Sequence, residues 1–285
     1  MTAKILNGKE IAKSKRADIK VKVDSLKKKG IIPGLAVILV GEDSASQTYV
    51  RSKQKACQTA GIHSVLIELP ESTSEQQLLT EIERLNQDQS IDGILVQLPL
   101  PTQISEYAIL EKITPHKDVD GFHPSNIGKL VIGERGFIPC TPYGILEMLR
   151  ASEVHIEGKH VVVVGRSNIV GKPVGQLLLN EHATVTYCHS KTENLEMITS
   201  QADILIVAVG RARFIKATAV KKGAVVIDVG INRVQEQLVG DVDFHEVKEV
   251  ASYITPVPGG VGPMTITMLL ENTVQSASRR ELWSC

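Results

Sequence analysis

The chain has 285 residues, of which 42% are hydrophobic, and its 32 lysines and arginines balance 32 acidic residues. At about 100–200 residues per domain, this length predicts two domains. Zero net charge, with no marked excess in either half, argues against a protein that holds nucleic acid or an acidic membrane by bulk charge.

The first 100 residues alternate between helical and buried-strand periodicity. The pattern predicts helices at 9–29, 44–60 and 74–88 and strands at 34–40, 63–69 and 91–98. These strands are continuous apolar runs, as expected for strands that are covered on both faces. Strands separated by helices predict βαβ units and a parallel sheet, so the expected fold class is α/β.

Residues 114–141 are rich in glycine and proline and show little periodicity, which predicts a domain junction or a functional loop region. A second α/β series follows. Its expected helices lie at 142–152, 171–181 and 192–200, and its expected strands at 160–164, 183–187, 203–209 and 224–229. A long helix at 263–280 comes after this series and is placed to pack on the first domain.

The four cysteines and the N-terminus bear on the compartment. Cys57, Cys140, Cys188 and Cys285 lie far apart without a C-x-x-C pair, which indicates reduced thiols rather than disulfides or a metal site. Residues 1–30 are basic but lack the apolar core of a signal peptide, and no segment approaches the roughly 18–20 apolar residues of a membrane span. We therefore expect a cytoplasmic protein with no bound metal.

The strongest ligand pattern lies in the second series. The strand at 160–164 runs into Gly165-Arg-Ser-Asn-Ile-Val-Gly171 and then an apolar helix, an arrangement that offers backbone N–H groups to a phosphate. The spacing is not G-x-G-x-x-G, and a purely structural turn is the alternative. No carboxylate ends the next strand, where Tyr187-Cys-His-Ser190 stands, and Arg166 lies in the turn. This combination favours a 2′-phosphate, hence NADP over NAD.

In the first series, Tyr49 and Lys53 are four residues apart and share one helix face, which by spacing alone is more often a surface pair. Gln97 ends a buried strand, at the sheet edge where α/β proteins bind ligands. Asp118 and Asp120 stand on a loop, where paired acids suggest either a metal or, more often, turn chemistry. The stiff segment Pro256-Val-Pro-Gly-Gly-Val-Gly-Pro263 is either a linker or a loop that lines a cleft between the domains.

Six segments in register resemble one family, the bifunctional methylenetetrahydrofolate dehydrogenase/methenyltetrahydrofolate cyclohydrolases. The matching segments are Tyr49-V-R-S-Lys53, Val96-Q-L-P-L-Pro101, Lys117-D-V-D-G-Phe122, Gly165-R-S-N-I-V-G-K-Pro173, Asp228-V-G-I-Asn232 and Pro256-V-P-G-G-V-G-P-M-Thr265. The resemblance implies a folate and catalytic domain at 1–140 that is completed by 263–285. It also implies a Rossmann-like NADP-binding domain at 141–262, with a folate cleft between the two domains.

The resemblance also implies roles for individual residues. Lys53 is the expected catalytic amine, positioned by Gln97, with Tyr49 stacked near the folate and Asp120 on the pteridine. The remaining residues implied to bind folate are Val96, Leu98, Pro258, Gly259, Gly260, Val261 and Gly262. The residues implied to contact NADP are Gly165, Arg166, Ser167, Ser190 and Ile231.

The implied reactions are oxidation of 5,10-methylenetetrahydrofolate with NADP and hydrolysis of the product to 10-formyltetrahydrofolate, in a homodimer. Hydride transfer needs alignment rather than a strong acid or base. Hydrolysis needs a general acid/base, and Lys53 can serve if burial keeps enough of it neutral. The alternatives are another two-domain NADP dehydrogenase, similar to shikimate dehydrogenase, and a nucleotide-binding module without enzymatic activity.

Overall fold

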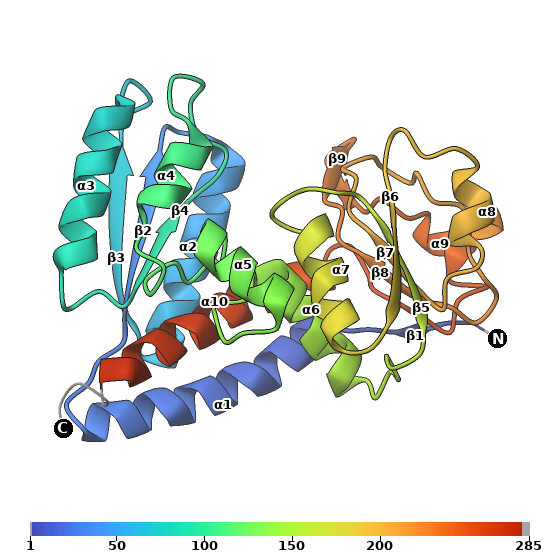
Figure 1. Cartoon of the computed structure of the whole chain (residues 1–285), viewed down its shortest axis with the longest axis horizontal. Coiled ribbons are helices and arrows are strands. Elements are labelled where there is room, and N and C mark those ends of the chain that lie inside the picture. The colour runs from blue at the N-terminus through green and yellow to red at the C-terminus, as the bar shows by residue number, and fades with distance from the viewer. Residues whose placement is uncertain (1, 281–285) are drawn as a thin grey trace. The chain divides into compact units, whose positions relative to one another are not determined.

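The computed structural model describes residues 2–280, apart from the side chain of Ala45. They divide into two compact units, which are described separately. Of these residues, the six-stranded unit comprises 2–13 and 141–265, and the three-stranded unit comprises 14–140 and 266–280. The boundaries fall within or at the ends of three helices (Figure 1), α1 (Gly8–Lys28), α6 (Cys140–Ala151) and α10 (Val261–Ser278).

The three-stranded unit is built on a parallel sheet in the order β3-β2-β4. All seven residues of the central strand β2 are buried, which explains its unbroken apolar sequence. β4 is likewise buried throughout. The expectation that the strand at 63–69 is covered on both faces was wrong, because β3 lies at an edge of the sheet and none of its residues is fully buried. The elements of this unit are β2 (Gly34–Val40), α2 (Ser44–Ala60), β3 (His63–Leu69), α3 (Glu75–Gln87), β4 (Gly93–Val96), α4 (Glu106–Lys112) and α5 (Pro124–Ile132).

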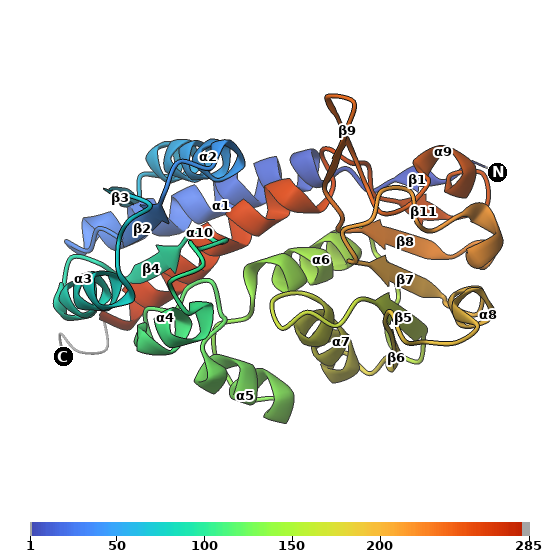
Figure 2. The ribbon, with the colours of Figure 1, turned by 90° about the horizontal axis from the view of Figure 1, so that it is seen from above.

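Two long helices extend along the three-stranded unit. The portions of α1 and α10 that belong to it lie side by side in both views (Figures 1 and 2). Arg16 donates from Nε to Thr267 Oγ1 at 2.8 Å, and Lys22 forms an ion pair with Glu271. The part of α10 that belongs to this unit therefore packs against α1.

The six-stranded unit contains a parallel sheet in the order β1-β11-β8-β7-β5-β6. The chain steps outward from β5 to β6 and then returns to the other side of β5 to form β7, so a topological switch point lies between β5 and β7. Ligands of open α/β sheets bind at the carboxyl ends of the strands at such a point. The strands are β1 (Lys4–Ile5), β5 (His160–Val164), β6 (Thr184–Cys188), β7 (Ile204–Val207), β8 (Val225–Asp228) and β11 (Tyr253–Ile254).

Shorter elements complete the six-stranded unit (Figure 2). The helices are α7 (Gly171–Asn180), α8 (Leu195–Thr199), α9 (Phe244–Val247) and a 3₁₀ turn at Ala217–Ala219. The antiparallel hairpin consists of β9 (Asn232–Val234) and β10 (Gln237–Val239). A buried cluster of aliphatic side chains packs on the sheet, drawn from β5, β7, β8 and the segments that follow them.

The α/β class, the two domains and the parallel sheets are confirmed. Residues 114–141 were expected to form a domain junction or a functional loop region, and a boundary between the units does fall at 140/141. The low periodicity there concealed a helix, α5, which has Pro124 in its first turn and the His123 side chain accepting from Ser125 N. Periodicity gave no indication of β1 and β11, which are two residues long, and β1 joins residues 2–13 to the six-stranded unit. None of the helices within residues 2–280 is long and apolar enough to cross a membrane.

Candidate active site

A buried lysine and a glutamine meet at the carboxyl edge of the three-stranded sheet. Lys53 lies on α2 and is 9% exposed, and its Nζ donates to Gln97 Oε1 at 2.9 Å. Gln97 directly follows β4, and its Nε2 donates to the carbonyl oxygen of Leu98 at 2.7 Å. Because β2 pairs with β4 and leads into α2, the sheet topology itself brings these two positions together.

Burial and the charges of neighbouring groups act on Lys53 in opposite directions. Burial lowers the pKa of Lys53 below 10.5, and the negative charge of Asp120 opposes this effect in part. Burial likewise raises the pKa of Asp120, while the charge of Lys53 lowers it. Cys140 is 1% exposed and donates from Sγ to Val119 O at 3.3 Å, and burial raises its thiol pKa well above 9.0. This buried amine is therefore easier to deprotonate than a free lysine.

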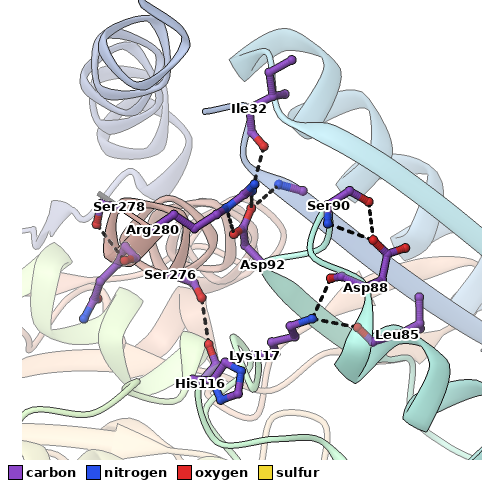
Figure 3. Close-up of polar contacts among 12 residues, drawn as sticks. Ile32, Leu85, Asp88, Ser90, Asp92, His116, Lys117, Ser276, Ser278 and Arg280 are labelled. Atoms are coloured by element: carbon purple, nitrogen blue, oxygen red, sulfur yellow. Dashed lines mark hydrogen bonds and ion pairs between the residues drawn. The ribbon is translucent and has the colours of Figure 1, made fainter. Parts of the chain in front are cut away.

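The loop that carries Asp120 is anchored from two helices. Lys117 donates from Nζ to the carbonyl oxygens of Leu85 and Asp88, at 2.8 Å each, near the end of α3 (Figure 3). Ser276, on α10, donates to the carbonyl oxygen of His116 at 2.8 Å. These bonds fix the start of the loop, and Figure 3 also shows Arg280 paired with the buried Asp92 beside it.

Asn272 and Asp118 fix the rest of this loop. Asn272 Nδ2 donates to Val119 O at 2.8 Å and to Ile138 O at 3.0 Å. Asp118 accepts from the backbone N–H groups of Phe122 and His123, and from Asn126. Burial raises the pKa of Asp118 to about 7. Of the two aspartates, Asp118 thus performs turn chemistry, and Asp120 is the one whose charge acts on Lys53.

The other residues expected near folate fall in two places. Tyr49 lies one turn before Lys53 on α2 and is 39% exposed, whereas Val96 is buried in β4 and Leu98 follows Gln97. The segment 258–262 belongs to the six-stranded unit. There Gly259 adopts a φ of +109° and its carbonyl oxygen accepts from Lys9 N at 3.2 Å, and Val261 begins α10.

In the six-stranded unit, the turn after β5 forms a tight cradle at the switch point. A Cβ on Gly165 would overlap the carbonyl oxygen of Ala208, which follows β7, and Gly165 N donates to Cys188 O at the end of β6. Ser167 Oγ accepts from the N–H groups of Val170 and Gly171 at the start of α7, both at 3.2 Å. The closely spaced strand ends and the N-terminus of α7 fit a phosphate-bearing ligand.

The charges at this edge fit a nucleotide with a 2′-phosphate. β5 and β6 pair in register, so Arg166 and Ser190 follow neighbouring strand ends, and Arg166 and Ser190 are both accessible to solvent. The residues after β6 are His189, Ser190 and Lys191, with no carboxylate among them. Ile231 is 48% exposed in the loop after β8, at the same edge of the sheet.

Sequence reasoning missed two residues that shape the surroundings of Lys53, Cys140 and Asn272. The sequence indicated Cys140 only as a reduced thiol. Cys57, Cys140 and Cys188 are free and buried, whereas Cys285 lies outside the described residues. Asn272 stands between Glu271 and Thr273 on α10, so its neighbours in the sequence gave no signal that its amide is buried.

Both units of the chain are similar to proteins of one family. Residues 6–120 match the catalytic-domain model of the tetrahydrofolate dehydrogenase/cyclohydrolase family, and residues 139–281 match its NAD(P)-binding domain. The curated "Bifunctional protein FolD" of Halalkalibacterium halodurans is 70% identical over 97% of this chain and 99% of its own length.

Solved structures agree with these matches. The bifunctional enzyme FolD from Campylobacter jejuni, a methylenetetrahydrofolate dehydrogenase/cyclohydrolase, superposes with a TM-score of 0.96 at 53% identity, covering 98% of this chain and 99% of that one. The Trypanosoma brucei enzyme, solved with NADP cofactor and inhibitor, gives 0.94 at 42% identity and covers 99% of each chain.

The shikimate dehydrogenase alternative is not favoured. Shikimate 5-dehydrogenase from Thermus thermophilus reaches a TM-score of only 0.54 at 17% identity, over 86% of this chain and 99% of that one. That likeness is one of fold alone. The two family models, by contrast, cover both units, so the chain belongs to the tetrahydrofolate dehydrogenase/cyclohydrolase family.

Proposed function

We propose that this protein oxidises 5,10-methylenetetrahydrofolate with NADP and hydrolyses the resulting 5,10-methenyltetrahydrofolate to 10-formyltetrahydrofolate. The single observation that carries the proposal is the buried Lys53 amine, held by Gln97 beside Asp120. It occurs in a chain whose relatives are bifunctional enzymes of this kind. A nucleotide-binding module without activity would have no use for such a group.

For the oxidation, NADP supplies the hydride acceptor, and the protein supplies alignment. Gly165, Arg166, Ser167, Ser190 and Ile231 hold the cofactor in this proposal. The missing Cβ of Gly165 allows the turn to close against the strand end after β7, and Arg166 offers a cation for the 2′-phosphate. Loss of hydride leaves a carbon cation stabilised by both folate nitrogens, so no strong acid or base is required.

For the hydrolysis, Lys53 acts as the general acid/base. Neutral Lys53 takes a proton from the water that attacks the methenyl carbon, which leaves a hydroxyl group on that carbon. The ammonium then returns a proton to the leaving folate nitrogen as its C–N bond breaks, and the hydroxyl group becomes the formyl C=O by releasing its proton to solvent. Gln97 orients Nζ, because its own amide is fixed by Leu98 O. Burial lowers the pKa of Lys53 and the charge of Asp120 raises it, so the balance between the two sets how readily Nζ exchanges its proton.

For the folate itself, Asp120 is the pteridine ligand, because a carboxylate accepts two parallel N–H bonds from the 2-amino and ring N–H groups. Tyr49 stacks near the folate, with Val96 and Leu98 beside Gln97. Folate contacts from the backbone of Pro258, Gly259, Gly260, Val261 and Gly262 are also part of the proposal, and their support is the resemblance to the family.

The assembly and the compartment are further parts of the proposal. A homodimer is supported only by resemblance to the family. A cytoplasmic location is supported by three buried free cysteines, since oxidising compartments favour disulfides.

A spectrophotometric assay tests the activity. The purified protein is mixed with 5,10-methylenetetrahydrofolate and NADP, and absorbance of methenyltetrahydrofolate and NADPH is followed. The proposal predicts NADPH formation together with a methenyl signal that decays to 10-formyltetrahydrofolate. No NADPH and no methenyl signal would contradict it, whereas a methenyl signal that never decays beyond the uncatalysed rate would contradict the hydrolysis alone.

A further inference from the structure

Asp241 is a buried carboxylate at the carboxyl edge of the six-stranded sheet, with no assigned role so far. It is 0% exposed and follows the hairpin formed by β9 and β10. Asp241 Oδ2 accepts from Val209 N at 2.6 Å and Gly210 N at 2.9 Å, and Oδ1 accepts from Arg211 N at 2.8 Å. Three successive backbone N–H groups after β7 therefore converge on one carboxylate.

The same carboxylate also fixes the loop after β8. Asn232 Nδ2 donates to Asp241 Oδ1 at 2.9 Å, and Gly230 packs so closely that a Cβ there would overlap the Asp241 carboxyl group. Ile231 lies between these two residues. Its backbone is therefore constrained on both sides by contacts with one side chain.

A second buried acid, Asp228, fixes Asp241 in turn. Asp228 Oδ1 accepts from Asp241 N at 2.9 Å and from Gly230 N at 3.0 Å, and Oδ2 accepts from Val242 N at 2.9 Å. Gly240 allows this approach, because a Cβ there would overlap Asp228 Oδ2. The two acids thus join the ends of β7 and β8 to the segment that follows β10, entirely within one unit.

We infer that Asp241 is a positioning residue for NADP, which sets the shape of the loops at 209–211 and 230–232 without touching the cofactor. The inference rests on the proposed function. Parallel strands present their ligand site at this edge, and Ile231 is one of the proposed cofactor contacts. A carboxylate group offers two oxygen acceptors, and here it accepts three hydrogen bonds from successive N–H groups of the loop at 209–211.

The test uses Asp241→Asn. The asparagine amide has one oxygen that can accept hydrogen bonds, and its N–H₂ group would face backbone N–H donors, with which it cannot bond. The matched control is Asp203→Asn. Asp203 also accepts a backbone bond, from His160 N at 3.0 Å, but it lies at the opposite end of the same sheet, before β7. NADP affinity is measured by isothermal titration calorimetry on the full chain, with no folate present.

We expect NADP to bind about tenfold or more weakly to Asp241→Asn, as is typical when a supporting residue behind a ligand-binding group is removed. Asp203→Asn should bind NADP as the wild type does. Hydrogen exchange should accelerate at the amides of 209–211 in Asp241→Asn at a temperature where the rest of the sheet stays protected. Cyclohydrolase activity on added methenyltetrahydrofolate, which needs no NADP, should remain close to that of the wild type.

Two results would overturn the inference. One is an unchanged NADP affinity in Asp241→Asn. The other is a loss of affinity that is matched by an equal loss of cyclohydrolase activity and by general unfolding, which would indicate a purely structural role. A wild-type protein that binds NADP but hydrolyses no methenyltetrahydrofolate would contradict the proposed function instead. In that case the NADP titrations of Asp241→Asn and Asp203→Asn, together with hydrogen exchange, would still decide the role of Asp241.

Discussion

Gln97 links Lys53 to the backbone through two hydrogen bonds. Lys53 Nζ donates to Gln97 Oε1 at 2.9 Å, and Gln97 Nε2 donates to Leu98 O at 2.7 Å. The second bond fixes which end of the amide faces the lysine. Gln97 thus holds Nζ in place without adding a charge that would favour its protonated form. A carboxylate in the same position would raise the pKa of Lys53.

Removing the amide should slow the hydrolysis while the fold is kept. Gln97→Leu keeps a similar volume but leaves Lys53 without its acceptor, so we expect kcat for cyclohydrolysis to fall about 10- to 100-fold through poor alignment. Hydrolysis assays and circular dichroism on the same samples check this. A variant with wild-type kcat would show that Gln97 does not position the amine.

The pH dependence of hydrolysis should follow the neutral fraction of Lys53. Because burial lowers its pKa, the rate should rise with pH and level off at a pH below 10.5. The charge of Asp120 raises the Lys53 pKa, so Asp120→Asn should move the rising limb of the pH–rate profile to lower pH. This shift in kcat is expected even if the same substitution increases KM for folate. Gln97→Glu adds a negative charge and should move the limb to higher pH.

These two shifts of opposite sign are measured as kcat against pH, after subtraction of uncatalysed hydrolysis. Shifts in the same direction, or a limb that neither substitution moves, would show that a group other than Lys53 titrates in the reaction.

Asn272 should couple the C-terminal helix to the folate site. Asn272→Leu leaves the carbonyl oxygens of Val119 and Ile138 without this donor, which we expect to cost about 1–3 kcal/mol of unfolding free energy. Displacement of Asp120, which follows Val119 directly, should also raise KM for methenyltetrahydrofolate several-fold.

The matched control is Thr273→Val, because the Thr273 hydroxyl bonds within α10, to Leu269 O at 2.8 Å. Urea unfolding and KM are measured for both variants. If Asn272→Leu changes KM no more than Thr273→Val does, the amide has no part in shaping the site.

Arg166 should determine the preference for NADP over NAD. Arg166→Ala removes the exposed cation next to the β6 edge, and we expect kcat/KM with NADP to fall about tenfold while that with NAD stays nearly unchanged. Arg233→Ala, on the β9–β10 hairpin, removes the same charge from another exposed position and serves as control. Equal losses with both cofactors would exclude a contact between Arg166 and the 2′-phosphate.

Much of the fold followed from local pattern. The buried runs 34–40 and 160–164 coincide with β2 and β5, since a strand covered on both faces has a continuous apolar sequence. The elements that could not be predicted are very short or depend on distant partners. The two residues of β1 form a strand only because β11, from the far end of the sequence, lies beside them.

The same distinction holds for the candidate sites. Lys53 and Gln97 were predicted as neighbours through family resemblance. The structure explains their contact by the pairing of β2 with β4, since β2 leads into the helix of Lys53 and β4 leads into Gln97. Asn272 and Asp241 were not predicted, because their roles come from backbone groups that they bind across 153 and 30 positions of sequence, respectively. No local spacing encodes such contacts.

The most direct test of the account is the fate of methenyltetrahydrofolate in Lys53→Met, a neutral side chain of similar length. With methylenetetrahydrofolate and NADP, this variant should still form NADPH but accumulate methenyltetrahydrofolate, with enzymatic hydrolysis reduced by at least about 100-fold. Lys53→Arg, which stays protonated, should behave in the same way and separates proton transfer from mere cationic charge. Decay of the methenyl signal at the wild-type rate in Lys53→Met would contradict the central claim that Lys53 is the acid/base of the hydrolysis.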